Sequence, residues 1–258
     1  MKLSQCAWLI LAIVLLSGCF SHSGSSSADL DKTIHTSLYP TGKYKIKRED
    51  PQRVLLEVAG LAEQQQTAKA LIKTDLVAVV VDFKQHRLIQ QPQVVARFDP
   101  SKVAYTQLDP KQNLAHLPKR PEQIRIYLKH GNRHQPAEVI VPVQGMGYFS
   151  MLYGYAAFNL HTLRLERIGF YQQAETPALG GQIMTNKKWL NQFSGKQVLN
   201  NGQPVFKVAP RHGHASIHSF DAISGATHTS KGVANLLNYW CGPAGYGPFF
   251  AKLSSQAS

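Results

Sequence analysis

The run Leu76–Phe83, with the sequence LVAVVVDF, constrains the fold of this chain more than any other segment. Valine is branched at Cβ and fits an extended backbone better than a helix, so a short apolar run of this kind predicts a buried strand. A buried strand requires a packed core around it. The composition can supply one, because 43% of the residues are hydrophobic and only 17% are charged.

The other periodic segments predict helices and strands in irregular order. Asp50-Pro51 indicates a helix start, and an apolar stripe at helical spacing follows it to about Lys73. Strands are predicted at 123–130, 138–144 and 163–172. Helices are predicted to start near Ser150 and to span 187–193 and 230–240, and residues 90–122, with five prolines, predict loops. This mixture predicts an α+β fold with a single domain at 49–258.

The N-terminal segment predicts export from the cytoplasm. Ala7–Phe20 is an apolar run that is short for a bilayer-spanning helix, which needs about 20 apolar residues, and it suits the core of a signal peptide. It contains Leu16-Ser-Gly-Cys19, which resembles the lipobox of bacterial lipoproteins, where cleavage precedes a cysteine that becomes acylated. We predict a lipoprotein-type signal at 1–19, lipidated at Cys19, with a short uncleaved membrane anchor as the alternative. Residues 20–48 are predicted to be a flexible basic tether.

Cysteine use and charge narrow the function classes. Besides Cys6 and Cys19, the chain has only Cys241, so no internal disulfide framework is expected and packing must hold the core together. The net charge of +13 would suit nucleic acid or an anionic membrane surface. The basic residues are scattered, however, and no nucleic-acid-binding motif accompanies them. We therefore expect a membrane nearby and no nucleic-acid partner.

Three histidines near the C-terminal third form the pattern H-x-H-x3-H, at His212, His214 and His218. Such a set can bind zinc, but no cysteine or carboxylate accompanies it except Asp221. Exposed histidines in a glycine-containing loop are the favoured interpretation, so no metal is predicted. The chain also lacks a P-loop, a dinucleotide-binding glycine fingerprint and a G-x-S-x-G nucleophile elbow.

The stretch Asp221–Ser230, DAISGATHTS, places two residues with very small side chains directly before Thr227. Gly225 and Ala226 leave the threonine hydroxyl open to a bulky group. The helix is expected to begin near Thr229 or Ser230, so an anion at Thr227 would lie close to a helix N-terminus, which favours negative charge. The alternative is an ordinary helix start in which Thr229 or Ser230 is the N-cap.

A second segment, Glu175–Gly181 with the sequence ETPALGG, predicts a tight turn after a strand. Backbone amides in such a turn can receive carbonyl or phosphate oxygens. A plain connecting loop would have a similar composition, so both interpretations stay open from the residues alone.

Asp221-Ala-Ile-Ser-Gly-Ala-Thr227 resembles the flavinylation motif D-x-x-[ST]-G-A-T, and its surroundings are similar to the C subunits of sodium-translocating NADH:quinone reductases. The blocks that carry the resemblance span about 53–253 and include V-A-G-L at 58–61, V-P-V-Q-G-M-G at 141–147, S-M-L-Y at 150–153, E-T-P-A-L-G-G at 175–181 and G-P-F-F-A-K-L at 247–253. The SGAT motif alone also occurs in related flavoproteins, including the G subunit of the Rnf complex.

The resemblance implies a covalent FMN, joined to Thr227 by a phosphoester that a dedicated flavin transferase forms outside the cytoplasm. Asp221 would belong to the motif that the transferase recognises. Ser224, Gly225 and Ala226 would form the approach to the threonine. The turn lying against the flavin would be formed by Glu175, Thr176, Leu179 and Gly180. No catalytic acid or base is implied, because the cofactor carries the electrons.

The implied function is an electron-transfer subunit on the path from NADH to ubiquinone that drives Na⁺ export, with NADH oxidised on another subunit. Other membrane subunits of the reductase would be its partners, and the domain would lie on the outer, periplasmic face of the cytoplasmic membrane. The alternatives are a stand-alone flavinylated envelope lipoprotein, an Rnf-type subunit, or a non-redox binding module that has lost its flavin site.

Three departures from the family pattern bear on this. Ala178 stands where the family usually has glycine, and a positive φ there would cost about 1 kcal/mol. His228 follows Thr227 where an apolar residue is usual. A lipobox-like segment replaces the usual N-terminal transmembrane helix.

Overall fold

The computed structural model describes residues 45–64, 67–131 and 135–257. These residues belong to one compact unit that starts at Gly42. The predicted signal or anchor at 1–19 and all but the last four residues of the predicted tether lie outside the described residues. Among the residues described, none forms a helix that is both long and apolar enough to span a membrane.

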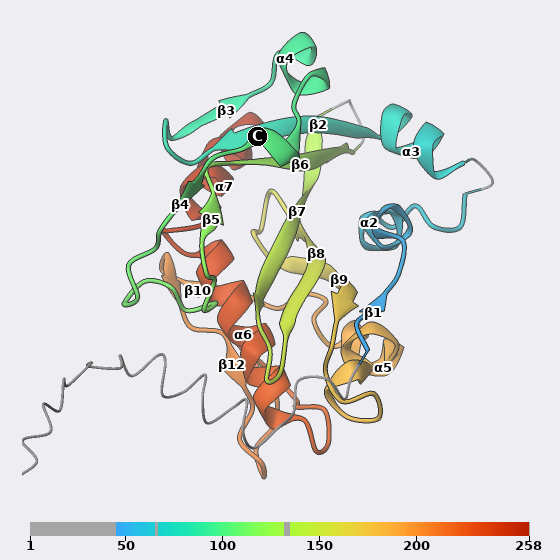
Figure 1. Ribbon diagram of the computed structural model, residues 1–258, viewed down its shortest axis with the longest axis vertical. Coiled ribbons are helices and arrows are strands. Elements are labelled where there is room, and N and C mark those ends of the chain that lie inside the picture. Colours follow the sequence, from blue (N-terminus) through green and yellow to red (C-terminus); the bar gives the residue numbers. More distant parts are fainter. Residues whose placement is uncertain (1–44, 65–66, 132–134, 258) are drawn as a thin grey trace, which may run out of the picture. The chain divides into compact units, whose positions relative to one another are not determined.

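An antiparallel sheet organises the described part of the chain, and the predicted α+β class is confirmed. Seven strands of this part form the sheet in the order β1-β9-β8-β7-β6-β2-β3, and all neighbours are antiparallel (Figure 1). Their bounds are Lys47–Arg48 (β1), Leu76–Asp82 (β2), Arg87–Ile89 (β3), Gln123–His130 (β6), Pro136–Met146 (β7), Met151–Asn159 (β8) and Leu165–Gln173 (β9).

The run of valines forms β2, as predicted, and pairs with β6 in a register that places Val79 opposite Ile126. The predicted strands at 123–130, 138–144 and 163–172 correspond to β6, β7 and β9. The helix expected near Ser150 is wrong, because this segment forms β8. Its residues alternate between the two faces of the sheet, and Leu152 and Ala156 are fully buried. Every residue of β8 is paired with a residue of β7.

Helices lie on both faces of this sheet (Figure 1). Their bounds are Pro51–Ala59 (α2), Ala68–Thr74 (α3), Pro92–Ala96 (α4), Lys187–Asn191 (α5), Thr227–Cys241 (α6) and Gly247–Ala257 (α7). The stripe expected to run to Lys73 is two helices, because Gly60 ends α2 in the left-handed region at φ 71°. Asp50 caps α2 with its side chain, and Pro51 is its first residue, as predicted.

Two buried clusters share the sheet between them. One contains the apolar residues of α6 and α7, and the other contains those of α2 and α3. Successive residues of β7 point to opposite clusters: Ile140 belongs to the α2 cluster, whereas Val139 and Val141 belong to the α6 cluster. The sheet therefore has a core on each face, and α6 is held along β7 by the larger one.

The segment 90–122 consists mainly of loops, as predicted, with α4 and short pieces of other structure. The short pieces in this segment are a 3₁₀ turn at Pro100–Lys102 (η1), β4 at Tyr105–Thr106 and β5 at Arg120–Pro121. The short pieces further along the chain are a 3₁₀ turn at Gly180–Met184 (η3), β10 at Leu199–Asn200, β11 at Gln203–Pro204, β12 at Lys207–Val208 and β13 at Ser219–Phe220. β12 and β13 pair in parallel, and β12 packs beside α6. Ala209, Pro210, Arg211 and Gly213 of the connection between them line a hollow together with Thr227, the first residue of α6.

Candidate functional site

Helix α6 begins at Thr227 itself. Its N-cap is the buried Ala226, which has no side-chain oxygen to offer, so the alternative in which Thr229 or Ser230 is the N-cap is wrong. The helix starts two or three residues before the expected position. The Ser230 hydroxyl lies one turn inside the helix, where it donates to the carbonyl of Ala226 at 3.0 Å and accepts from the N–H of Ile223 at 3.1 Å. Ser230 thereby fixes the approach to the helix without capping it.

The first turn of α6 leaves backbone donors free. No acceptor within the described residues takes the N–H of Thr227, His228 or Thr229. The free N–H groups of a helix N-terminus, together with the helix macrodipole, attract anions. An acidic side chain is also absent from this first turn. The Thr227 hydroxyl therefore lies where a phosphate group would be stabilised.

Thr227 opens onto a groove of about 540 Å³, a volume within the range of small-molecule sites. One wall is the motif, which contributes Asp221, Ala222, Ile223, Ser224, Gly225 and Thr227. The opposite wall is the β12–β13 connection with its flanking residue, which contributes Val208, Ala209, Pro210, Arg211 and Gly213. Thr227, Ser224 and Gly225 are exposed to solvent. The groove therefore brings together four of the predicted site residues and one basic side chain.

The backbone of Asp221 is held by hydrogen bonds with the α5 segment. Its N–H donates to Gln192 Oε1 at 2.7 Å, and its carbonyl accepts from Trp189 Nε1 at 2.8 Å. Because Trp189 is buried in the core, the motif starts from a rigid point. The exposed Asp221 carboxylate lines the groove.

Glu175 has a role that the sequence did not reveal. Its side chain is buried, and its two carboxylate oxygens accept hydrogen bonds from the N–H groups of Tyr148 (3.2 Å), Phe149 (2.9 Å) and Ser150 (2.9 Å) and from the hydroxyls of Ser150 (3.0 Å) and Thr229 (2.6 Å). A carboxylate removed from water requires such donors. Glu175 therefore joins the turn before β8 to the first turn of α6.

Glycines make this junction possible. A Cβ placed on Gly180 would lie 2.4 Å from Thr229 Oγ1, and one on Gly147 would lie 2.7 Å from Glu175 Oε1. A Cβ on Gly232 would lie 2.5 Å from the carbonyl oxygen of Met146. Three segments distant in sequence thus approach more closely than any side chain would allow.

The 175–181 turn reaches the motif through Leu179. This side chain is 39% exposed, and its Cδ2 lies 2.9 Å from the position of a Cβ on Gly225. Gly225 has φ 72°, in the left-handed region that glycine adopts without strain. The backbone of Ala178 is outside that region, so the strain considered for it does not arise. The Thr176 carbonyl closes the turn by accepting from Leu179 N at 3.0 Å and Gly181 N at 2.9 Å.

Comparison with known proteins identifies the family. A family model described as an FMN-binding domain matches residues 147–242. The C subunit of the Na(+)-translocating NADH-quinone reductase of Yersinia pestis is 34% identical over 218 residues, which are 81% of this chain and 81% of that protein. The C subunit of the same reductase in Pasteurella multocida is 34% identical over 257 residues, or 95% of this chain and 94% of that protein.

The chain belongs to the family of C subunits of the Na(+)-translocating NADH-quinone reductase. A crystal structure of NqrC from Shewanella oneidensis agrees with the fold, with a TM-score of 0.69 at 25% identity over 79% of this chain and 96% of that one. The predicted membership of a redox enzyme complex and the predicted single FMN-binding domain are both confirmed. The matched domain runs from Gly147 through the ETPALGG turn and the motif to the end of α6.

The predicted flavin residues of this protein fall into two groups. Asp221, Ser224, Gly225 and Thr227 line the groove, and Leu179 lies beside it. Glu175, Thr176, Gly180 and the N-cap Ala226 lie behind it and hold the wall in place. His228, the unusual neighbour of Thr227, is exposed and stacks on the Tyr148 ring with centroids 4.8 Å apart.

The three histidines considered as metal ligands do not form a cluster. Within the described part of the chain, no group of three His, Cys, Asp or Glu side chains is arranged to hold a metal ion. His218 contacts the carbonyl of Gln197 through Nδ1 at 2.9 Å. His212 and His214 are exposed on either side of Gly213 at the groove. The last cysteine, Cys241, is buried, and burial raises the pKa of its thiol, which disfavours the nucleophilic thiolate.

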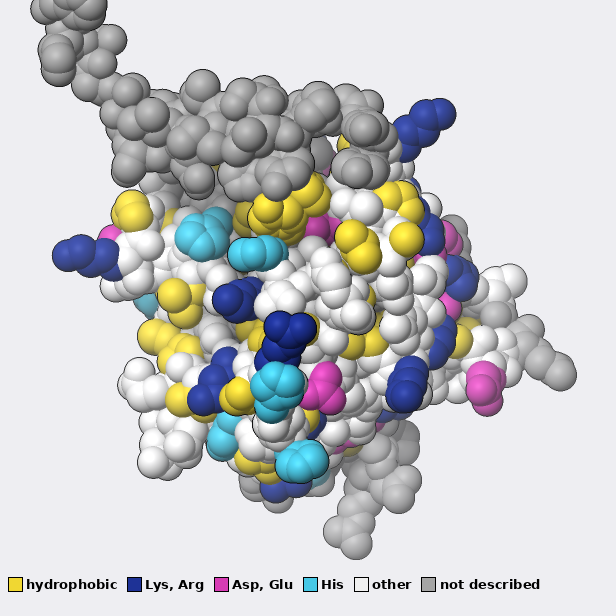
Figure 2. Space-filling view, turned by 90° about the horizontal axis from the view of Figure 1, so that it is seen from below, with side chains coloured by type: hydrophobic (Ala, Val, Ile, Leu, Met, Phe, Trp, Pro, Cys, Tyr) yellow, Lys and Arg dark blue, Asp and Glu magenta, His cyan; other side chains and the backbone are white. Residues whose placement is uncertain are grey.

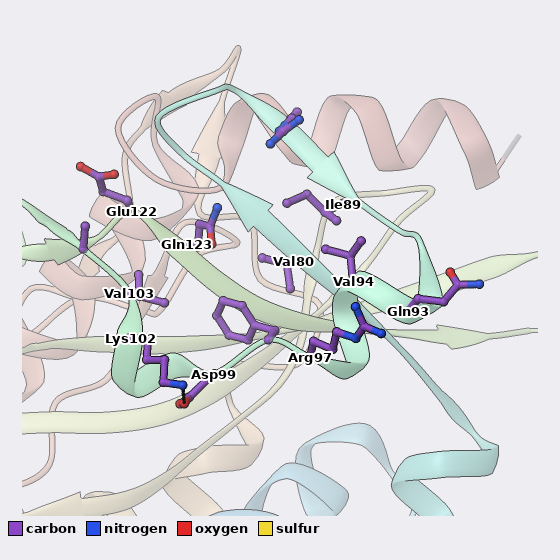
Figure 3. Close-up of a pocket in the computed structure, with 13 residues that line it drawn as sticks. Val80, Ile89, Gln93, Val94, Arg97, Asp99, Lys102, Val103, Glu122 and Gln123 are labelled. Atoms are coloured by element: carbon purple, nitrogen blue, oxygen red, sulfur yellow. Dashed lines mark ion pairs between the residues drawn. The ribbon is translucent and has the colours of Figure 1, made fainter.

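A larger hollow, of about 660 Å³, lies between β2, β3, α4 and η1 (Figure 3). Its basic side chains are mostly balanced: Lys102 Nζ is 3.7 Å from Asp99 Oδ2, and Arg87 Nε is 3.6 Å from Asp82 Oδ2. None of the motif residues lines it. Its size alone assigns it no function.

Sequence reasoning missed Arg211 and the rest of the β12–β13 wall. The available signal was the proline–arginine–histidine–glycine run at 210–213, which was considered only for metal binding. Parallel pairing of two-residue strands carries no sequence signature, so its position over Thr227 follows from tertiary structure alone.

Proposed function

We propose that this protein holds FMN as a phosphoester of Thr227 and passes electrons within the Na(+)-translocating NADH-quinone reductase. The observation that carries the proposal is the position of the exposed Thr227 hydroxyl, at an uncapped helix N-terminus and at the edge of a groove of about 540 Å³. The free N–H groups of α6 favour the phosphate, and the groove accommodates the attached group.

Each predicted residue has a physical part in this proposal. Gly225 permits the left-handed backbone that brings the chain round to Thr227, and Ser224 and Asp221 border the threonine. Leu179 offers an apolar contact for the flavin ring, while Glu175 fixes the two segments that meet behind it. FMN supplies the redox chemistry, and the protein supplies position and electrostatic environment.

The proposal includes the maturation and location that the resemblance implies. A flavin transferase outside the cytoplasm attaches FMN to Thr227, with Asp221 in its recognition motif. The residues 1–19 anchor the chain, through Cys19 lipidation or a short helix, to the cytoplasmic membrane with the domain on its outer face. The other reductase subunits supply the NADH site and the quinone site.

Expression with the flavin transferase, followed by a denaturing gel viewed under ultraviolet light, tests the attachment. We expect a fluorescent band in the parent chain and in the control Thr162→Val, whose side chain is exposed in the β8–β9 turn. We expect complete loss of the band in Thr227→Val. A band that persists in Thr227→Val contradicts the assignment, and absence of the band in the parent chain contradicts covalent flavin.

Co-purification tests the place in a complex. Tagged full-length chain should retain the other reductase subunits after mild detergent extraction. A flavinylated chain that purifies alone, with its electron transfer intact, would instead favour the stand-alone envelope lipoprotein.

A further inference from the structure

The face that carries the groove bears a group of exposed basic side chains. We name this group the cationic rim: Lys207, Arg211, His212, His214, His228 and Lys231. Arg211 lines the groove with Thr227, and His212 and His214 adjoin Gly213 in the same wall. His228 and Lys231 follow Thr227 on α6, and Lys207 lies in β12, which packs beside α6. Figure 2 views the end of the molecule where α6 begins, and shows histidine, lysine and arginine side chains gathered there.

The basic side chains of the rim lack direct ion pairs with the acids of the described residues. Asp221 is the only acidic residue after Glu175, and Glu175 is buried behind the groove. Two other lysines do have acidic partners. Lys84, between β2 and β3, forms an ion pair with Glu122, and Lys102, in η1, forms one with Asp99. Asp221 also lines the groove, so one exposed carboxylate there stands against the Lys and Arg side chains of the rim, Lys207, Arg211 and Lys231. Among the described residues of the rim and the groove lining, the excess charge is therefore positive.

The turn and the connection beside the groove each carry one exposed apolar side chain. Leu179 beside Gly225 and Ile217 in the β12–β13 connection are 39% and 38% exposed. A few apolar contacts surrounded by charge are typical of small, transient interfaces. Complementary charge in such an interface raises the association rate more than the affinity.

We propose that the cationic rim is the docking surface for an acidic protein that exchanges electrons with the flavin. The proposal rests on the function proposed above, because it takes the groove as the flavin position. An electron donor or acceptor must approach the flavin through the open groove. Arg211 of the rim lines that groove, and the other rim residues lie on the segments that build it or on α6, which starts at it. We favour a protein over a lipid surface because the exposed apolar residues beside the groove are two separated side chains and not a continuous membrane-inserting face.

The test uses the flavinylated chain and two redox proteins of opposite charge. The chain, reduced with dithionite and freed from excess reductant, is mixed in a stopped-flow instrument with oxidised plastocyanin of acidic surface. One electron passes from the flavin to each copper. The second oxidant is basic mitochondrial cytochrome c, which takes one electron per haem. The fluorescent band on a denaturing gel first confirms that each variant carries flavin, so failure of attachment is distinguished from failure of docking.

For the parent chain, we expect the rate with acidic plastocyanin to fall at least about tenfold from 20 to 300 mM NaCl. The rate with cytochrome c should rise with salt. The variant Lys207→Glu/Lys231→Glu, which spares the groove-lining residues, should lose about tenfold with plastocyanin at 20 mM NaCl and gain with cytochrome c. The control Lys84→Glu/Lys102→Glu makes the same change in net charge at a distant surface and should stay within about twofold of the parent.

Two outcomes overturn the proposal. If both double variants slow the reaction equally, the effect comes from net charge and not from the rim. If the parent chain sediments with phosphatidylglycerol vesicles and only the rim variant fails to do so, the rim is a lipid-binding surface.

Discussion

Two hollows on this molecule are similar in size but differ in how the chain builds them. The hollow between β2, β3, α4 and η1 is the larger, at about 660 Å³, and side chains on exposed elements line it. The groove at Thr227 measures about 540 Å³, and small residues make up much of its lining: Ala209, Gly213, Ala222, Ser224, Gly225 and Thr227. Behind the groove lie a buried carboxylate with five donors and glycines in contact with distant segments. The comparison teaches that the candidate site is distinguished by the hydrogen bonds and close packing that fix its walls, and not by its volume.

The family comparison agrees with this distinction. The FMN-binding domain match runs from Gly147 to Gly242. It therefore contains both walls of the groove and Glu175 with the residues that donate hydrogen bonds to it. All lining residues of the larger hollow come before this span, and the last of them is Gln123. A search by size alone would have selected the part of the chain outside the matched domain.

The largest effect is expected for Glu175→Ala. Five donors would lose their acceptor, one of them the buried Thr229 hydroxyl and the others partly buried, so the free energy of unfolding should fall by about 3 kcal/mol or more. Urea denaturation followed by circular dichroism measures this. The control Glu57→Ala removes exposed ion pairs to Arg53 and Lys187 and should cost at most about 1 kcal/mol. Equal effects from the two variants would show that the groove is no more constrained than the surface.

An intermediate effect is expected for Gly225→Ala. The residue has φ 72°, so a side chain there costs about 1 kcal/mol, and its Cβ also meets Leu179. Gly202→Ala is the matched control, because Gly202 has φ 76° with nothing within 4 Å of the added Cβ. Thermal unfolding of both variants should place Gly225→Ala below Gly202→Ala. Flavin fluorescence per mole of protein should fall only in Gly225→Ala.

Flavin retention that is the same in both glycine variants would break the link between this backbone position and the site. It would show that the groove accepts the added methyl group by moving Leu179, whose side chain is partly exposed.

The smallest effect is expected in the larger hollow. The double variant Arg97→Ala/Lys102→Ala alters two exposed side chains there, so the free energy of unfolding should change by no more than about 0.5 kcal/mol. Flavin content and electron-transfer rate should equal those of the parent chain. A marked loss of either property would assign this hollow a functional role and would weaken the contrast between the two.

Much of the fold could be predicted because the signals were local. The valine run gave β2, alternation gave β6, β7 and β9, and an amphipathic stripe gave most of α6. β8 was misread because its small residues and aromatics have no obvious period until β7 is placed beside it. The start of α6 was misplaced by two or three residues, near Thr229 or Ser230, because the N-cap Ala226 has no capping side chain that would mark the true start in the sequence.

The sequence by itself determined the family and the threonine that the motif presents, because both depend on residue types at fixed spacing. Tertiary structure alone decided what surrounds that threonine. Glu175 lies 54 positions from Thr229 along the chain, and Arg211 comes from a loop with no periodic pattern. Hydrogen bonds and close packing over such separations depend on how the sheet and α6 fold together, and no local propensity encodes them.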